Sequence, residues 1–179
     1  SKSSGVYTWS DYTITGKVGT YKIVATYTDT TPDPDVVYAV SSNAITVTYG
    51  ALYELAVTGQ PDGNAVNRAA EGPIEVTALD QDGNTVTGFT GTVNLSLTKR
   101  AGDGSYSATA DASISATGPS KSSGVYTWSD YTITGKVGTY KIVATYTDTT
   151  PDPDVVYAVS SNAITVTNAA LYELAVTGQ

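Results

Sequence analysis

The sequence predicts an all-β protein, an antiparallel β-sandwich that recurs in tandem with a period of 119 residues. The repeat is the first observation, because residues 1–48 return unchanged as residues 120–167. Self-similarity at a period this long indicates an array of whole domains, since the rung of a solenoid is much shorter. The second observation is the pattern inside one unit, where short runs of β-branched and aromatic residues alternate with Gly, Pro, Asn and Asp turns.

The repeat also predicts the domain organisation. Residues 49–60 return as residues 168–179 with two differences, Tyr49 against Asn168 and Gly50 against Ala169. A unit of this length is large enough to bury its own core. We therefore divide the chain into the C-terminal half of one Ig-sized repeat, a complete repeat and the first strand of a further repeat, at residues 1–48, 51–167 and 170–179.

About seven strands are expected in the complete repeat. A turn cluster at Asp80–Asn84 follows the second strand, because Asp-Gly tolerates the positive φ of tight turns. The Gly-, Ser- and Ala-rich segment Lys99–Pro119 predicts a long loop that carries one short edge strand. The predicted strands are 52–58, 74–79, 92–97, 113–116, 125–134, 139–147 and 162–167.

Alternation of apolar and polar residues predicts which faces of the strands form the core. In the strand at 139–147, every second residue from Tyr140 to Tyr146 is apolar or aromatic, so we expect this face to point inward. In the strand at 125–134 the alternation shifts at Ser129-Asp130, which predicts a bulge there.

Seven antiparallel strands in a unit of this size fit an Ig-like sandwich. The spacing Gly138-x-Tyr140-x-Ile142 resembles a tyrosine corner, in which a Tyr hydroxyl bonds to backbone a few residues upstream. Trp128 is expected to join Tyr140 in the core. The last strand of one repeat is followed almost at once by the first strand of the next, across residues 167–171, so we expect limited bending between domains.

Two stretches resemble the bacterial Ig-like repeats of surface adhesins and of cell-wall or S-layer proteins. They are VTALDQDGNTVTGFTGTVNLSL at Val76–Leu97 and GVYTWSDYTITGKVGTYKIVAT at Gly124–Thr145. The resemblance implies an extracellular, cell-surface location and a stalk or spacer that displays another element. It is informative about fold rather than about function, because the same sandwich serves many roles.

Composition narrows the classes of function that we expect. Histidine and cysteine are both absent, which removes the commonest general base and the thiolate nucleophile. No pair of carboxylates suggests general acid–base work, so we do not expect an enzyme. The net charge of −8 opposes nucleic-acid binding. No apolar run is long enough for a membrane span in this segment.

Calcium is the one cofactor that the sequence suggests. Each copy carries three carboxylates around a Pro-Asp-Pro-Asp loop, and hard oxygen ligands of this kind suit Ca²⁺. Asp80 and Asp82 form a poorer second candidate, since an Asp-Gly turn already explains them. The alternative for every one of these residues is that Asp and Pro form turns on a solvated tip, and no cofactor is required. The loop residues are Asp148, Asp152 and Asp154 and, in the first copy, Asp29, Asp33 and Asp35.

The repeat and the resemblance together predict a structural function, as part of an extracellular stalk, filament or surface layer. The alternative is an adhesin, a binding module that recognises a carbohydrate or a receptor on a host or cell surface, and equal domains would give it avidity. Tyr126, Tyr131 and Tyr157 are candidates for an exposed adhesive stripe. The sequon Asn94-Leu95-Ser96 marks a candidate glycan site.

Other copies of the chain are the expected partners. Residues 1–48 supply only the last strands of a sandwich, and residues 51–119 can pair either with them or with residues 120–167. A half-sandwich alone cannot offset its chain entropy by burial. We therefore expect assembly by β-strand or half-domain exchange between subunits, with unpaired strand edges recruiting other chains.

Overall fold

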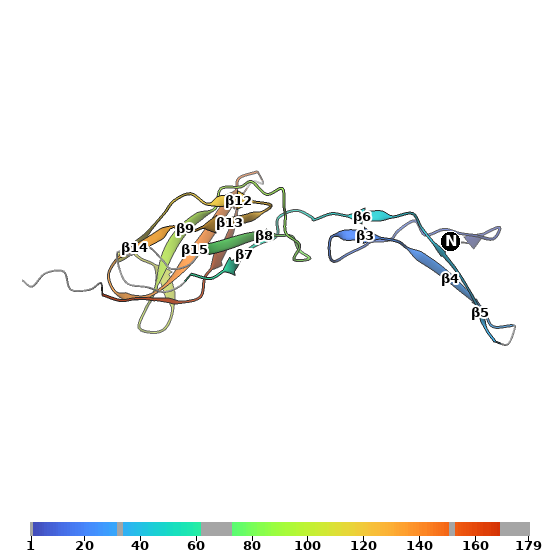
Figure 1. Cartoon of the computed structure of the whole chain (residues 1–179), viewed down its shortest axis with the longest axis horizontal. Helices are drawn as coiled ribbons and strands as arrows, with labels where there is room; N and C mark the ends of the chain where they lie inside the picture. The colour runs from blue at the N-terminus through green and yellow to red at the C-terminus, as the bar shows by residue number, and fades with distance from the viewer. Residues whose placement is uncertain (1, 32–33, 62–72, 151–152, 169–179) are drawn as a thin grey trace, which may run out of the picture.

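A computed structural model of the chain describes residues 2–31, 34–61, 73–150 and 153–168. These residues form strands, turns and irregular connections but no helix, and so none that is long and apolar enough to cross a membrane. Packed strands of residues 51–168, called the body, lie at one end, and narrow hairpins of residues 2–50, called the arm, extend from it (Figure 1).

The body holds eleven strand segments among its described residues. They are β7 (Glu54–Gly59), β8 (Ile74–Leu79), β9 (Asn94–Arg100), β10 (Tyr106–Ala108), β11 (Ala112–Ala116), β12 (Ser120–Ser122), β13 (Val125–Trp128), β14 (Tyr131–Gly135), β15 (Gly138–Asp148), β16 (Val155–Ser160) and β17 (Ile164–Val166).

Two antiparallel sheets make up most of the body and share one core. The first has the order β12-β13-β8-β7, and the second has the order β10-β9-β15-β16, with β17 also paired to β15. β11 pairs with β14, which follows β13 after a break at Ser129 and Asp130. Strands of both sheets contribute to a single buried cluster, which comprises Leu55, Ile74, Val76, Ala78, Val86, Val93, Leu97, Tyr126, Trp128, Tyr131, Ile133, Tyr140, Ile142, Ala144, Ile164 and Val166.

The inward face predicted for residues 139–147 is confirmed in β15. Tyr140, Ile142 and Ala144 are almost completely buried, and Tyr146 packs against the edge of the core. The Tyr140 hydroxyl donates a 2.6 Å hydrogen bond to the carbonyl oxygen of Lys136, four residues upstream. This bond is the corner contact that the Gly-x-Tyr spacing predicts, and it fixes the turn by which the chain passes from β14 to β15.

The prediction of a long loop at Lys99–Pro119 is wrong for most of this segment, but the short edge strand predicted within it at 113–116 is present as β11. β9 continues to Arg100 and forms a hairpin with β10, and β11 then pairs with β14 over its full length. These strands lie at or near sheet edges, where backbone hydrogen bonds hold them and little side-chain burial is needed. Their Ser, Ala and Thr residues therefore lack the apolar alternation by which a strand is recognised. β16 was missed as well, because its run of apolar residues shows no clear alternation.

The arm contains six strand segments, which pair as three local hairpins. They are β1 (Lys2–Ser3), β2 (Val6–Tyr7), β3 (Gly19–Tyr21), β4 (Val24–Asp29), β5 (Val36–Ser41) and β6 (Ile45–Val47). The pairs are β1 with β2, β3 with β6 and β4 with β5, and their registers equal those of β12 with β13, β15 with β17 and β15 with β16 at an offset of 119 residues.

Candidate functional site

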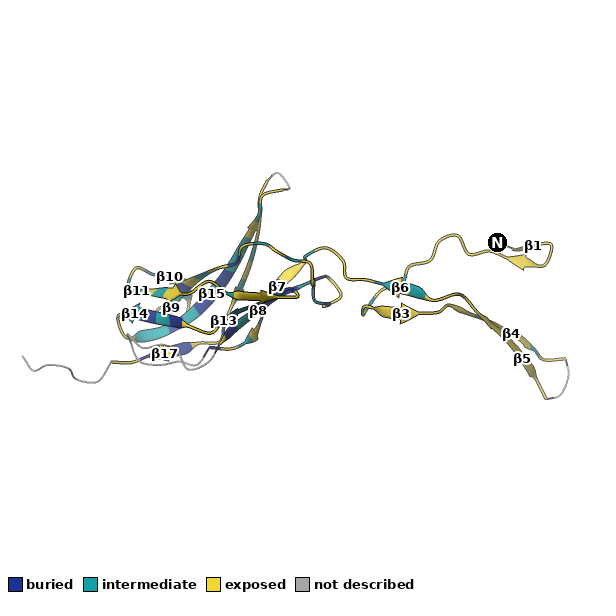
Figure 2. Cartoon of the chain, turned by 45° about the horizontal axis from the view of Figure 1, so that its top comes forward, coloured by how far each residue is buried: buried dark blue, intermediate teal, exposed yellow. Residues whose placement is uncertain are grey.

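The arm exposes side chains whose counterparts form the core of the body. Trp9 is 67% exposed and its counterpart Trp128 is 3% exposed, while Tyr7 is 57% exposed and Tyr126 is 0% exposed. Because these residues have identical sequence neighbours, the difference comes from what covers them. Figure 2 shows the contrast, with an arm that is mostly exposed and a body with buried interiors of its strands. Other exposed apolar residues of the arm are Val6, Tyr12, Tyr21, Ile23, Val24, Tyr27 and Val40.

This apolar face of the arm has the same aromatic arrangement as the body. The rings of Tyr7 and Trp9 lie 6.3 Å apart, as do those of Tyr126 and Trp128. The pair Tyr27–Tyr38 is stacked in the arm as Tyr146–Tyr157 is in the body. An open recess of about 700 Å³ lies over the arm's face, lined by Lys2, Tyr7, Trp9, Ala25, Thr26, Tyr27, Tyr38, Ala39 and Val40.

In the body, residues 74–100 cover the corresponding face. β8 pairs with β13, and β9 pairs with β15, so both sheets combine strands of the two half-repeats. The Tyr126 hydroxyl donates a 2.7 Å hydrogen bond to the carbonyl oxygen of Gly91, and its ring contacts Phe89 at 5.7 Å between centroids. Tyr126 and Tyr131 are therefore buried, and the prediction that they form an exposed adhesive stripe is wrong.

A second candidate lies where the arm meets the body, at the Asp80–Asn84 turn that we call the junction turn. Asp80 and Asn84 are both buried although they belong to a turn. Asp80 Oδ1 accepts hydrogen bonds from the amides of Asp82 at 3.0 Å and Asn84 at 2.8 Å. Its Oδ2 accepts from the amide of Gly50 at 2.9 Å and from Asn84 Nδ2 at 3.0 Å. Gly83 adopts a φ of 71°, the positive value that its place in the turn predicts.

These donors stabilise the charged form of Asp80. The Gly50 amide has the largest effect and lowers the pKa of the Asp80 carboxyl to about 2, with the Asn84 and Asp82 amides adding to it. All four of the bonds described above come from N–H groups, so Asp80 is arranged as a carboxylate that caps a turn and not as an open metal ligand. This arrangement supports the turn interpretation over the second calcium candidate.

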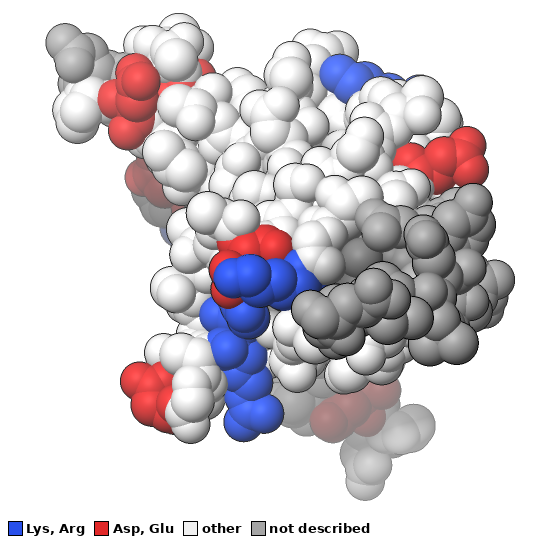
Figure 3. Space-filling view, turned by 90° about the vertical axis from the view of Figure 1, so that its left-hand side faces the viewer, with Lys and Arg blue, Asp and Glu red and all other residues white. Residues whose placement is uncertain are grey.

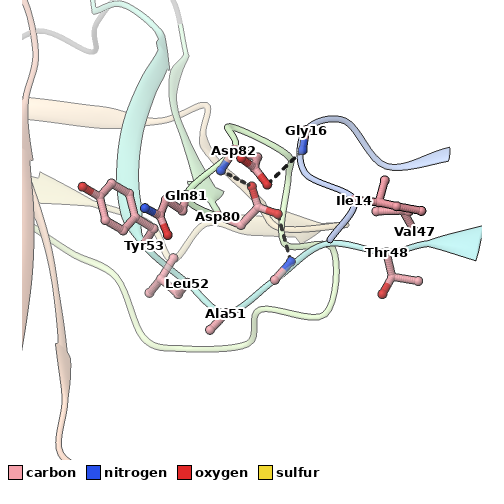
Figure 4. Close-up of a pocket in the computed structure, with 11 residues that line it drawn as sticks. Ile14, Gly16, Val47, Thr48, Ala51, Leu52, Tyr53, Asp80, Gln81 and Asp82 are labelled. Atoms are coloured by element: carbon pink, nitrogen blue, oxygen red, sulfur yellow. Dashed lines mark hydrogen bonds between the residues drawn. The ribbon is translucent and has the colours of Figure 1, made fainter. Parts of the chain in front are cut away.

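The junction turn also binds the segment Gly16–Val18 of the arm, called the arm corner. Asn84 Nδ2 donates to the Gly16 carbonyl at 3.0 Å, and the Val18 amide donates to Asn84 Oδ1 at 3.1 Å. The Gly16 amide donates to Asp82 Oδ2 at 3.2 Å. Figure 4 shows these segments meeting around an open recess of about 340 Å³, with Asp80 directed at the linker that joins arm and body.

Lysine 17 adds a charged contact to the same place. Lys17 Nζ donates to the carbonyl oxygens of Asp82 at 3.2 Å and Gly83 at 3.0 Å. The Tyr21 hydroxyl donates to the Lys17 carbonyl at 2.6 Å, so the arm corner is closed by the same bond as the Lys136 corner of the body. The bonds between the junction turn and the arm corner are therefore polar, in contrast to the apolar face of the arm.

The predicted calcium loops are described only in part. Asp148 Oδ1 accepts from the amide and hydroxyl of Thr150, and Asp29 Oδ1 accepts from Thr31 in the same way. These bonds lower the pKa of both carboxyls. Among the described residues no group of three His, Cys, Asp or Glu is placed to hold a metal ion. Asp152 and Asp33 lie outside the described residues, while Asp154 and Asp35 are exposed, so calcium stays a prediction.

A charged cluster occupies the start of β15 and the end of β9. Asp111 forms ion pairs with Lys136, at 2.8 Å, and with Lys99. Lys136 has the larger effect, and together the two ammonium groups lower the pKa of the Asp111 carboxyl to about 2. Figure 3 shows the end of the body that faces away from the arm, where basic side chains form a strip beside acidic ones. Asn94, the candidate glycan site, is exposed at the start of β9.

Sequence reasoning missed the junction and the Asp111 cluster. Both depend on contacts between residues far apart in the chain, such as Asn84 with Gly16, 68 positions apart. The only signal was the short link between repeats, which indicated limited bending but not the groups that would cause it.

No protein-family model, no curated protein and no solved structure matches this chain. Two sites of the molecule therefore bear on its function, the apolar face of the arm and the junction between arm and body.

Proposed function

We propose that this protein is a building unit of an extracellular stalk, filament or surface layer, made of tandem Ig-like sandwiches that are completed by other copies of the repeat. The strand order supports the Ig-like assignment. With β7 as strand A, β8 as B, β9 as C, β10 as C′, β11 and β12 as D, β13 and β14 as E, β15 as F, and β16 and β17 as G, the sheets have the orders D-E-B-A and C′-C-F-G.

The main support for the proposal is that one sequence occurs twice in the chain, once covered by other strands and once exposed. Side chains such as those of Tyr126 and Trp128 are buried under residues 74–100 in the body, and their counterparts Tyr7 and Trp9, with the same sequence neighbours, are exposed in the arm. The complement of the arm's apolar face is therefore a segment with the sequence of residues 51–119. Donor segments of this type, added edge to edge, join subunits through backbone hydrogen bonds and a shared core.

The energetics favour such completion. Burial of one large apolar side chain such as Trp9 contributes about 1.5–3 kcal/mol. The arm also exposes Tyr7, Tyr27 and several Val residues on neighbouring strands. Soluble monomers seldom leave contiguous apolar surface of this kind uncovered, and such surface usually marks an interaction site.

An adhesin remains the second candidate, because aromatic side chains line the recess over the arm. Aromatic faces of this kind can stack on sugar rings. The same rings, however, fill a core when their partner strands are present, as Tyr126 and Trp128 do. Their arrangement is thus explained by the repeat itself, which favours the structural role. The extracellular location is part of the proposal and rests on the resemblance of Val76–Leu97 and Gly124–Thr145 to surface repeats.

Sedimentation of the full 179-residue chain over a range of concentrations tests the proposal. We expect oligomers that grow with concentration, and we expect Trp9→Lys to prevent them because a charge then occupies the apolar face. The matched control is Val37→Lys. Val37 is 63% exposed and its counterpart Val156 is 62% exposed, so this position stays at the surface in a completed repeat. The control should associate as the unmodified chain does.

The outcome that contradicts self-completion is a chain that stays monomeric at every concentration. Equal loss of association in Trp9→Lys and Val37→Lys would also contradict it, because the contact would then not involve the core-forming face. Binding of glycans to a monomeric chain that Trp9→Lys abolishes would support the adhesin instead.

A further inference from the structure

We propose that the junction turn is a docking surface for the corner of a neighbouring repeat, and that this contact sets the direction in which one repeat follows another. The inference rests on the proposed function, since it concerns consecutive repeats of an array. The partner is a second copy of the segment Gly-Lys-Val-Gly, which occurs at residues 16–19 and 135–138.

Asn84 recognises the backbone of the arm corner from both sides. Its amide group donates to the Gly16 carbonyl, and its carbonyl accepts from the Val18 amide, so one side chain satisfies two main-chain groups. Asp80 fixes the orientation of Asn84, because Asp80 Oδ2 accepts from the same Nδ2 atom. With the side-chain oxygen facing an N–H and the nitrogen facing two acceptors, only one orientation of the amide satisfies all three bonds.

The junction turn holds the arm at two separate points. One is the linker, where Gly50 donates to Asp80, and the other is the arm corner, where Gly16 and Val18 meet Asn84. A linker attached at one point permits rotation about it. A second attachment, more than thirty residues away along the chain, removes most of that freedom, so bending and twisting both require hydrogen bonds to break.

The body carries the same corner at its other end. Gly135 has a φ of 129° and Gly16 a φ of 115°, and Tyr140 closes its corner as Tyr21 closes the arm corner. Val137 is 47% exposed and Val18 48% exposed. Within the described part of the chain, Val137 is not covered by a junction turn, and Figure 1 places the end of β14 away from the arm. Asp111 and Ala112 contact the body corner at Gly135 and Lys136, and Val137 is left exposed for the junction turn of a following repeat.

A junction turn at one end and a corner at the other make the contact heterologous. Each repeat uses its turn for the repeat before it and its corner for the repeat after it, which generates an open linear array. Lys136 is compatible with this use. It forms an ion pair with Asp111, and because an ammonium group has three donors, two remain for turn carbonyls of the kind that Lys17 contacts.

The test measures the spread of distances between arm and body in the full chain. The sequence has no cysteine, so Thr28→Cys and Ser115→Cys, both at exposed strand positions, give two unique sites for nitroxide labels. Double electron–electron resonance on labelled chains diluted into unlabelled chains then reports the distance within one molecule. We expect a narrow distribution that broadens several-fold in Asn84→Ala. Asn94→Ala is the matched control, because Asn94 is exposed on β9 away from the junction.

A second variant protects the test against a fold defect in Asn84→Ala. Val18→Pro removes the amide that donates to Asn84 and leaves every residue of the body unchanged. It should broaden the distribution while the melting temperature of the body stays the same. A broad distribution in the unmodified chain, or a narrow one in both variants, overturns the proposal. A monomeric chain with a narrow distribution contradicts only self-completion, and an associating chain with a broad distribution contradicts only the docking surface.

Discussion

At the scale of single residues, Tyr140 illustrates how burial determines what a corner hydrogen bond contributes to stability. Its hydroxyl and that of Tyr21 make the same bond, but Tyr140 is fully buried and Tyr21 is exposed to solvent. Removing the donor from this partly buried pair leaves the Lys136 carbonyl without its partner. The exposed carbonyl of Lys17 can bond to water instead.

Tyr140→Phe should therefore lower the free energy of unfolding of the body by about 1–2 kcal/mol. Urea denaturation followed by circular dichroism measures this difference. Tyr21→Phe is the matched control, because it deletes the same hydroxyl outside the body, and the midpoint of the body should not move. A loss near zero in Tyr140→Phe would mean that the corner bond does not stabilise the sandwich.

The ion pairs of Asp111 predict a dependence on acid. Lys136 and then Lys99 hold its pKa at about 2, below the ordinary value of 3.8, so the folded state favours the charged carboxylate. The sign is that of a depressed carboxyl, whose contribution is complete above about pH 4 and disappears as the pH falls to about 2. Asp111→Asn should lower stability at pH 6 and flatten the decline between pH 4 and pH 2, as measured by urea denaturation. An unchanged slope would show that other groups control acid sensitivity.

At the scale of elements, hairpin pairing is local and burial is not. The arm hairpins have the registers of the body hairpins although no sandwich surrounds them. The strand at 74–79 and the alternation of β15 could be predicted because the β-branched, apolar and aromatic residues that indicate them lie within each strand. β11 matches the short edge strand predicted at 113–116, whereas β10 was not predicted, because its residues show no apolar alternation and it is held by its pairing with β9.

The loop between β15 and β16 is the element on which calcium can be tested. Binding by Asp148, Asp152 and Asp154 predicts a higher melting temperature in millimolar Ca²⁺ than in EGTA, since a ligand of the folded state alone stabilises it by mass action. Asp148→Ala should abolish the difference. Because Thr150 already donates to Asp148, equal melting temperatures in the two buffers would leave the turn-capping role as the sufficient explanation.

At the scale of the whole molecule, the two tryptophans report on the two environments. Trp128→Phe leaves Trp9 as the sole fluorophore, and its emission should move to shorter wavelength as concentration rises and the arm is completed. Trp9→Phe leaves the buried Trp128, whose emission should not change with concentration. A Trp9 spectrum that stays solvent-like under conditions of association would place the contact elsewhere.

The sequence was informative about one of the two sites. Counting strands in residues 1–48 predicted that their apolar side chains lack a cover, because half of a repeat cannot form two sheets. The junction could not be predicted in this way. From the sequence, Asp80 and Asn84 are predicted only to form a hairpin turn. Their contacts with the arm depend on where residues 16–18 and Gly50 lie in space.

The positions of the first and last strands of the body also limit which segments of one chain can form a sandwich together. β17 ends beside the start of β15, whereas β7 starts beside the end of β8, which pairs with the start of β13. Those two places are separated by the combined length of β13 and β14, on the order of 30 Å at about 3.3 Å per residue. The link from the end of β6 at Val47 to the start of β7 at Glu54 spans at most about 25 Å. A circularly permuted sandwich of residues 1–48 and 51–119 within one chain would therefore strain this link even when it is fully extended, which favours completion of the arm by a segment of another copy.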